Sequence, residues 1–219
     1  MDTRTKALGV SVVSSALVLL LVAEASQAGV ETARAANGAE TTKISTNGRS
    51  AFALLSAGDT NGFLNASYDE IADTSALDFA YATPDGTDPD LVILIAGAGE
   101  IPNEAFTITR TTAHLTVTTP FLVTRCVVSL ETGFFDCAPG SSVTFDLVWA
   151  RSGISTVLEK TKRVETLGPV ITKFHGEYEQ LSASVSGTWD AYAAADMFGE
   201  LFDSKGTTLV REMTIKSKH

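Results

Sequence analysis

Residues 181–189, which read LSASVSGTW, alternate an apolar face with a face of serine and threonine hydroxyls. Residues 142–149 (SVTFDLVW) and 112–118 (TAHLTVT) repeat this two-residue period. Alternation of this kind is typical of antiparallel strands that pack one side on a core and leave the other in water. The pattern predicts an antiparallel sheet, with Trp149 and Trp189 on the side that faces the core.

Turn-forming sequences separate the alternating runs, as in residues 58–62 (GDTNG) and 84–90 (PDGTDPD). This spacing predicts a single all-β antiparallel domain over residues 49–219 with roughly eleven to twelve strands, a β-sandwich being favoured over a soluble up-and-down barrel. Charged residues on both faces of 154–166 predict a long exposed strand with a guarded edge. Residues 191–202 (AYAAADMFGELF) are compatible with a short helix or with a strand.

The N-terminus has the three-part layout of a secretory signal peptide. Arg4 and Lys6 precede an uncharged run at 7–22, and small residues then offer cleavage after Ala25 or Ala28. We therefore expect residues 1–28 to be a signal peptide and the mature chain to be secreted or periplasmic, without a membrane span. Residues 29–48 are small and polar without an apolar period, and we expect a flexible segment there.

The two cysteines, Cys126 and Cys137, flank a segment that reads as a hairpin. A fold about the 131/132 peptide places them directly opposite each other, within disulfide reach. Export favours such a bond. The chain-entropy model gives so short a loop only about 2–3 kcal/mol, so we expect the bond to staple one hairpin.

His175, Glu177 and Glu179 alternate along residues 170–179 and therefore share one face of a strand. A histidine beside two carboxylates is a candidate group for acid–base catalysis, and paired carboxylates are the catalytic groups of glycosidases. The competing interpretation, which we favour, is a polar outer face on which both glutamates are solvent-exposed.

Asp85, Asp88 and Asp90 crowd one loop and are candidate Ca²⁺ ligands, although their spacing is not that of an EF-hand. A solvated acidic turn is the interpretation we favour. The hydroxyl-rich faces at 112–118 and 182–188 are compatible with polysaccharide binding or with plain hydration. Asn65 opens a glycosylation sequon, Asn65-Ala66-Ser67, which matters only in a host that glycosylates.

Charge and motifs restrict the function. The formal charge of −10 disfavours nucleic acid as a partner, and no motif indicates a cofactor. The sequence favours an exported, non-catalytic binding or surface-associated domain whose ligand is an unknown glycan or protein. One alternative is a secreted polysaccharide hydrolase that uses the carboxylates near 175–179. The other is a soluble barrel that carries a small apolar ligand.

Overall fold

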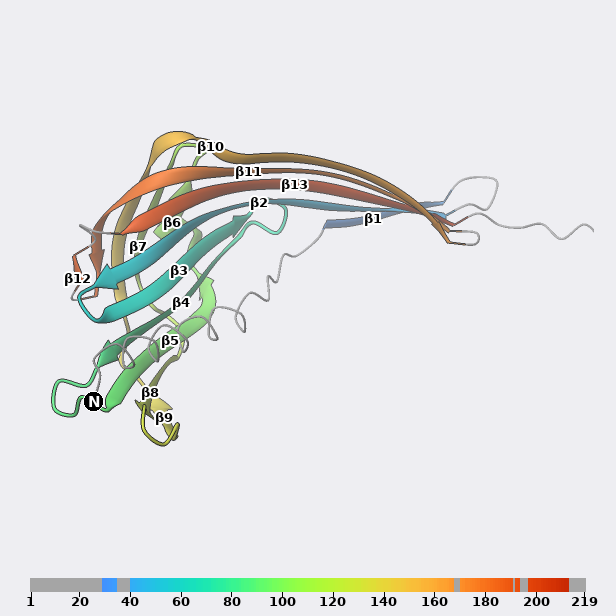
Figure 1. The fold of residues 1–219 in the computed structure, drawn as a ribbon. Coiled ribbons are helices and arrows are strands. Elements are labelled where there is room, and N and C mark those ends of the chain that lie inside the picture. The colour runs from blue at the N-terminus through green and yellow to red at the C-terminus, as the bar shows by residue number, and fades with distance from the viewer. Residues whose placement is uncertain (1–28, 35–39, 168–169, 191, 194–196, 213–219) are drawn as a thin grey trace, which may run out of the picture.

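The computed structural model describes residues 29–34, 40–167, 170–190, 192–193 and 197–212. These residues form thirteen strands and one short 3₁₀ turn, η1 (Asn103–Ala105) (Figure 1). The first strands are β1 (Gly29–Arg34), β2 (Glu40–Ala57), β3 (Thr60–Asp69), β4 (Thr74–Pro84), β5 (Leu91–Ile101), β6 (Phe106–Ile108) and β7 (Thr112–Thr118). The others are β8 (Val123–Ser129), β9 (Phe135–Pro139), β10 (Thr144–Leu167), β11 (Val170–Trp189), β12 (Tyr192–Ala193) and β13 (Phe198–Glu212).

All the strands belong to one sheet, and every described pairing is antiparallel. The strand order is β6-β7-β10-β11-β13-β2-β3-β4-β5-β8-β9, with β1 added beside β2 and β12 beside β11. The terminal strands of this path, β6 and β9, do not pair, so the sheet is not closed into a barrel. The predicted all-β, antiparallel single domain is confirmed. The single sheet curls so that one of its faces packs against itself. In a β-sandwich, by contrast, two separate sheets pack face to face.

Aromatic rings from distant strands meet inside the curl. Phe79 on β4 lies 5.0 Å from Phe145 on β10 and 6.4 Å from Trp189 on β11, measured between ring centroids. The indole nitrogen of Trp149 donates a hydrogen bond of 2.8 Å to the carbonyl oxygen of Phe52, three strands away in the sheet. Trp149 and Trp189 are fully buried, which confirms their predicted place in the core. We call the side of the sheet that carries these residues the inner face.

Close packing under Trp149 requires a glycine. A Cβ added to Gly199 on β13 would lie 2.9 Å from Cδ1 of Trp149 and 2.3 Å from Cγ2 of Val185. The absence of a side chain at this position therefore lets the indole cross β13 and reach Phe52 on β2. Trp149 thus joins β10 to β2 across the interior of the curled sheet.

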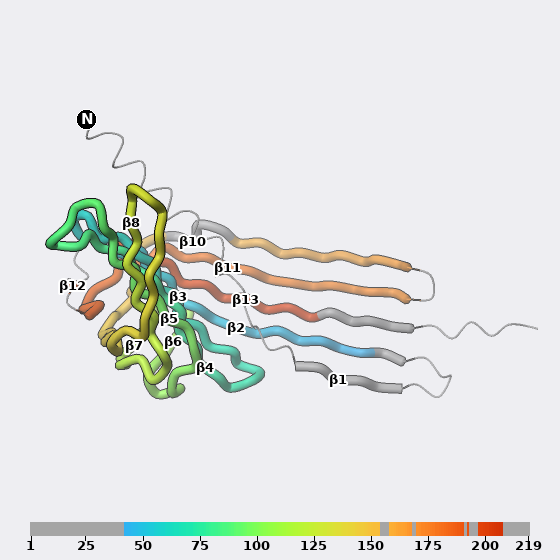
Figure 2. Tube along the Cα trace, turned by 90° about the horizontal axis from the view of Figure 1, so that it is seen from below, coloured from blue at the N-terminus to red at the C-terminus, as the bar shows by residue number. Residues whose placement is uncertain are grey.

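Several strands continue far beyond the core and form a projection that we call the arm (Figures 1 and 2). It consists of β1 with residues 40–48 of β2, 158–167 of β10, 170–180 of β11 and 203–212 of β13. The parent strands are 18, 24, 20 and 15 residues long, whereas a typical strand has about 5–6 residues. The predicted exposed strand at 154–166 is confirmed as part of β10.

The arm also changes two expectations. Residues 29–34 and 40–48 form strands of the arm in place of the expected flexible segment. A strand with both faces in water needs no apolar alternation, because pairing with its neighbours satisfies its backbone. In the region left open at 191–202, the described residues 192–193 and 198–202 are strand. The expected signal peptide lies outside the described residues.

Two irregularities in β10 set which side chains the arm presents. The register of β10 with β11 shifts between Arg151 and Ser155 and again between Ser155 and Val157. Before the shifts, odd-numbered residues such as Trp149 lie on the inner face. After them Lys160 pairs with Glu177 and Lys162 with His175, so the even-numbered residues of β10 lie on the inner face. Extra residues in one strand reverse its alternation in this way.

Candidate functional site

The three residues singled out in the sequence lie together on the inner face of β11, within the arm. Odd-numbered residues of β11 continue the phase of buried Leu181 and Ala183, so His175, Glu177 and Glu179 project from the same side. The predicted common face is confirmed. The two carboxylates nevertheless have different surroundings.

Glu177 is held by a lysine from the neighbouring strand. Nζ of Lys160 donates a hydrogen bond of 2.9 Å to Oε1 of Glu177, and both side chains are well exposed. This hydrogen bond, together with the charge of Lys160, lowers the pKa of Glu177. A general acid needs a raised pKa to remain protonated near neutral pH. The environment of Glu177 is therefore opposite to that of a glycosidase acid.

Glu179 departs from the solvent-exposed position that we favoured. The residue is only 9% exposed, and its two carboxylate oxygens accept hydrogen bonds of 2.9 and 2.8 Å from Nε and Nη2 of Arg110. Arg110 lies in the loop between β6 and β7, and the hydrogen bonds that it donates to Glu179 raise the pKa of its guanidinium group. Such a bidentate pair anchors one loop to the root of the arm.

Further charged groups line the same root. Arg49 on β2 lies 2.9 Å from Oε1 of Glu70 and 3.6 Å from Oδ2 of Asp203, and Asp203 is the register partner of Glu179 on β13. Asn47 donates its side-chain amide to Glu70. Within the described residues, Oδ1 of Asn47 is buried without a hydrogen-bond partner. An unsatisfied acceptor beside a hollow is a site for a donor from a ligand or a water.

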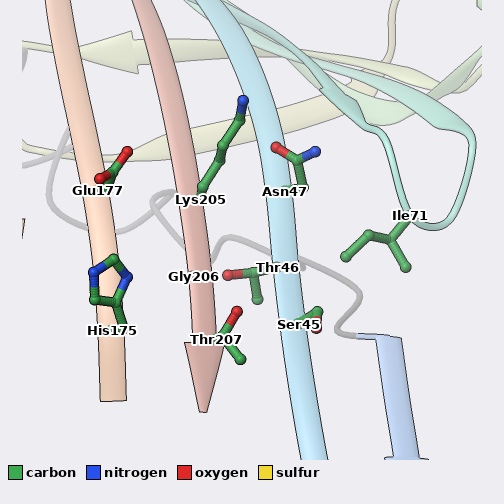
Figure 3. A pocket seen from close by; sticks show the side chains of 9 residues that line it. All are labelled: Ser45, Thr46, Asn47, Ile71, His175, Glu177, Lys205, Gly206 and Thr207. Carbon is green, nitrogen blue, oxygen red and sulfur yellow. The ribbon is translucent and has the colours of Figure 1, made fainter.

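A shallow depression of about 520 Å³ opens beside this network (Figure 3). It crosses β11, β13 and β2 and is bounded by the β3–β4 turn. The lining residues are Ser45, Thr46, Asn47, Ile71, His175, Glu177, Lys205, Gly206 and Thr207. The hollow is open to solvent and contains donors, acceptors and one cation, which suits recognition of a polar surface group.

The lysines of the described part of the chain all lie on this side of the arm. Every lysine among the described residues lies on the inner face, as the registers of β10, β11, β13 and β2 show, and together they form what we call the lysine face: Lys43, Lys160, Lys162, Lys173 and Lys205. Lys162 and Lys173 make no hydrogen bond or ion pair with any residue that the structure describes. Sequence reasoning missed this surface because the register shifts in β10 reverse the phase on which Lys160 and Lys162 project.

The aspartates singled out as Ca²⁺ candidates form a structured turn between β4 and β5. Oδ1 of Asp85 accepts hydrogen bonds from the amide and hydroxyl of Thr87, and Oδ1 of Asp88 accepts one from the amide of Asp90. The hydroxyl of Thr87 lowers the pKa of Asp85. In the described part of the chain, no group of three or more His, Cys, Asp or Glu side chains is placed to hold a metal ion.

The hydroxyl face of β7 lies on the outside of the sheet. Thr116 and His114 contact each other and share Asp146 of β10, at distances of 2.9 to 3.3 Å. The side-chain amide of Asn65, in the sequon, donates to Asp78 on β4. Cys126 and Cys137 face each other on β8 and β9 and form the predicted disulfide.

Comparison of the chain with protein-family models, curated proteins and solved structures finds no match. Among the residues described, no helix has the length and apolarity needed to cross a bilayer.

Proposed function

We propose that the chain is an exported, non-catalytic binding module that takes anionic ligands on its lysine face. The confinement of lysine to that face is the observation that carries the proposal. The arm holds equal numbers of basic and acidic residues, so the curled part carries the acidic excess of a chain whose net charge is −10. A local cationic surface on an acidic protein favours one kind of ligand and orients it.

The shape of the arm supports binding over catalysis. Apart from Glu179, the described side chains of the arm are exposed or half-buried on both faces, so the arm presents surface without enclosing a site that excludes water. Glu177 and Glu179 are each held by a basic side chain, which leaves little support for the hydrolase alternative. Aromatic rings fill the interior, which leaves little support for a carrier of apolar ligands.

Export is supported by the leader-like residues 1–28 and by the disulfide, because disulfides persist in oxidising compartments. Fractionation of cells of its native host, combined with protease treatment, tests this part of the proposal. The chain should be found outside the cytoplasm, where added protease can reach it, and should lack Met1. Material found only in the cytoplasm, with Met1 retained, contradicts it.

Binding is tested with labelled poly-L-glutamate and polygalacturonate as carboxylated probes and with dextran as a neutral one. Fluorescence anisotropy at low protein concentration should show binding to a carboxylated probe and none to dextran. Lys162→Glu should weaken binding about tenfold, a loss of about 1.4 kcal/mol.

Arg163→Glu is the matched control. Arg163 is the next residue on β10, is exposed, changes charge by the same amount and projects from the outer face. Its binding should stay within about twofold of wild type, because a rim or remote charge contributes little. Equal losses in both variants, or no binding by the wild type, contradict the lysine face as the site.

A further inference from the structure

We propose that the lysine face of one copy binds the acidic end of a second copy, so that the chain assembles head to tail. This inference rests on the proposed function, because it uses the same face, and it names the partner. The acidic end, which we call the acidic tip, consists of the β4–β5 loop and the β8–β9 hairpin. Its defining residues are Asp85, Asp88, Asp90, Glu131, Phe134, Phe135 and Asp136.

Charge complementarity is the first argument. The acidic tip carries five carboxylates, all of them exposed or half-buried, and the lysine face carries five lysines, of which Lys160 is paired with Glu177. Arg125 on β8 lies near this end: after the hydrogen bonds from Thr87, its charge also lowers the pKa of Asp85. At physiological salt, charges interact over about 8 Å. Local attraction between the two surfaces therefore outweighs the repulsion between two distant acidic bodies.

Apolar complementarity is the second argument. Phe134 and Phe135 at the acidic tip are 66% and 53% exposed. On the lysine face, Leu158 and Val164 are 61% and 64% exposed, and Ile71 projects beside the hollow with 41% exposure. Aromatic residues, phenylalanine among them, are enriched at protein interfaces. Aliphatic side chains among lysines give those rings an apolar surface to cover.

The rigidity of the acidic tip is the third argument. The Cys126–Cys137 bond staples the hairpin, and the amide of Leu130 donates a hydrogen bond of 2.8 Å to the carbonyl oxygen of Asp90, which ties hairpin to loop. Asp85 and Asp88 brace the loop through their own hydrogen bonds. A surface that is ordered before binding loses less entropy on association.

The choice of a protein over a glycan follows from the same faces. Sugars stack on exposed aromatic rings, and within the arm the rings of Phe174 and Tyr178 lie on the outer face, opposite the lysines. Figures 1 and 2 place the acidic tip away from the projecting end of the arm. Because the two surfaces differ and lie apart, their contact is heterologous, and repetition builds an open chain of subunits.

Sedimentation velocity of the protein expressed from the full sequence tests the assembly. At micromolar concentrations and physiological salt, the wild type should form a concentration-dependent series of oligomers. These oligomers should dissociate in about 1 M salt, where the Debye length falls to about 3 Å. A wild type that stays monomeric under all these conditions overturns the inference.

Two variants sharpen the test. Lys162→Glu/Lys173→Glu reverses charge on the arm, and Glu131→Gln/Asp136→Asn removes charge from the acidic tip. Each alone should associate at least tenfold more weakly than the wild type and should be monomeric at concentrations where the wild type assembles. Their equimolar mixture should instead give a one-to-one dimer and nothing larger, because only one pair of intact surfaces remains. A mixture of two monomers, or continued assembly of either variant alone, overturns the inference.

The mixture also controls for folding, since a misfolded variant cannot form the dimer. Poly-L-glutamate separates this inference from the proposed function. If the wild type is monomeric yet binds the probe through its lysine face, the partner is wrong and the binding module stands. If Lys162→Glu/Lys173→Glu binds the probe as well as the wild type does, the proposed function fails with it.

Discussion

Two glutamates on one strand face, separated by a single residue, have unlike roles. Glu179 is buried and receives two hydrogen bonds from Arg110, whereas Glu177 is exposed and meets Lys160. Sequence alternation correctly predicted their common face. It could not predict that Arg110, which is 69 residues away from Glu179 along the chain, closes over one of them. That contact depends on the curl of the sheet, which no local pattern specifies.

Substitution by glutamine distinguishes the two positions. Glu179→Gln should lower the free energy of unfolding by about 1–2 kcal/mol, because it removes the charge from a nearly buried pair of hydrogen bonds. Glu177→Gln, the matched control, should change it by less than about 0.5 kcal/mol, as at ordinary surface sites. Urea denaturation measures both. Equal effects contradict the assignment of Glu179 as an anchor.

Tyr81 gives the fold a sensitivity to alkali. Burial, followed by the charge of Asp190, raises the pKa of Tyr81 to about 12 from 10.0, and its ring packs against Trp189 and Tyr192. The folded state thus favours the neutral phenol. The stability from this preference is fully present below pH 10 and is lost as the pH rises towards 12.

The loss over that interval is about 2–3 kcal/mol in wild type. In Tyr81→Phe, which keeps the ring and removes the titrating group, this part of the pH dependence should disappear. Urea midpoints just below pH 10 and near pH 12 make the comparison. Identical alkaline slopes in the two proteins contradict the buried, neutral phenol.

At the scale of elements, the β8–β9 hairpin was the most predictable part of the molecule. The ten residues between the cysteines fold symmetrically, so Cys126 pairs with Cys137 as the sequence predicts. Gly133 adopts a φ of +68°, which an L side chain rarely does, within the turn. Residues 42–48 of β2 were less predictable, because these half-buried residues lack the apolar period by which strands are recognised.

Replacing both cysteines with serine separates two roles of the disulfide. The free energy of unfolding should fall by about 2–3 kcal/mol with the fold retained, since the bond closes a short loop. Head-to-tail association should weaken, whereas poly-L-glutamate binding should not change, because the lysine face lies elsewhere. Thermal unfolding, sedimentation and anisotropy give these readouts. Complete unfolding, or unchanged association, contradicts the assigned roles.

At the scale of the whole molecule, the sequence predicted the antiparallel all-β domain and its tryptophan core from alternation alone. It did not predict the arm. The turn after β2, within residues 58–62, is visible in the sequence, but nothing local states that β10, β11, β13 and β2 outrun their neighbours. Segments such as 158–167 carry charge on both faces. Which charged side chains share a face with the other lysines of the arm is therefore known only once the pairing of β10, β11, β13 and β2 is known.

The register shifts between Arg151 and Val157 have a consequence for how this segment can vary in length. Each inserted or deleted residue there moves Lys160 and Lys162 to the opposite face of the arm, whereas a change of two residues returns them to the face of Lys173. A change in length by an odd number of residues therefore moves the side chains of residues 158–167 to the opposite face of the sheet, and a change by an even number leaves them where they are. If the cationic surface is under selection, insertions and deletions in this segment of β10 should be restricted to even numbers of residues.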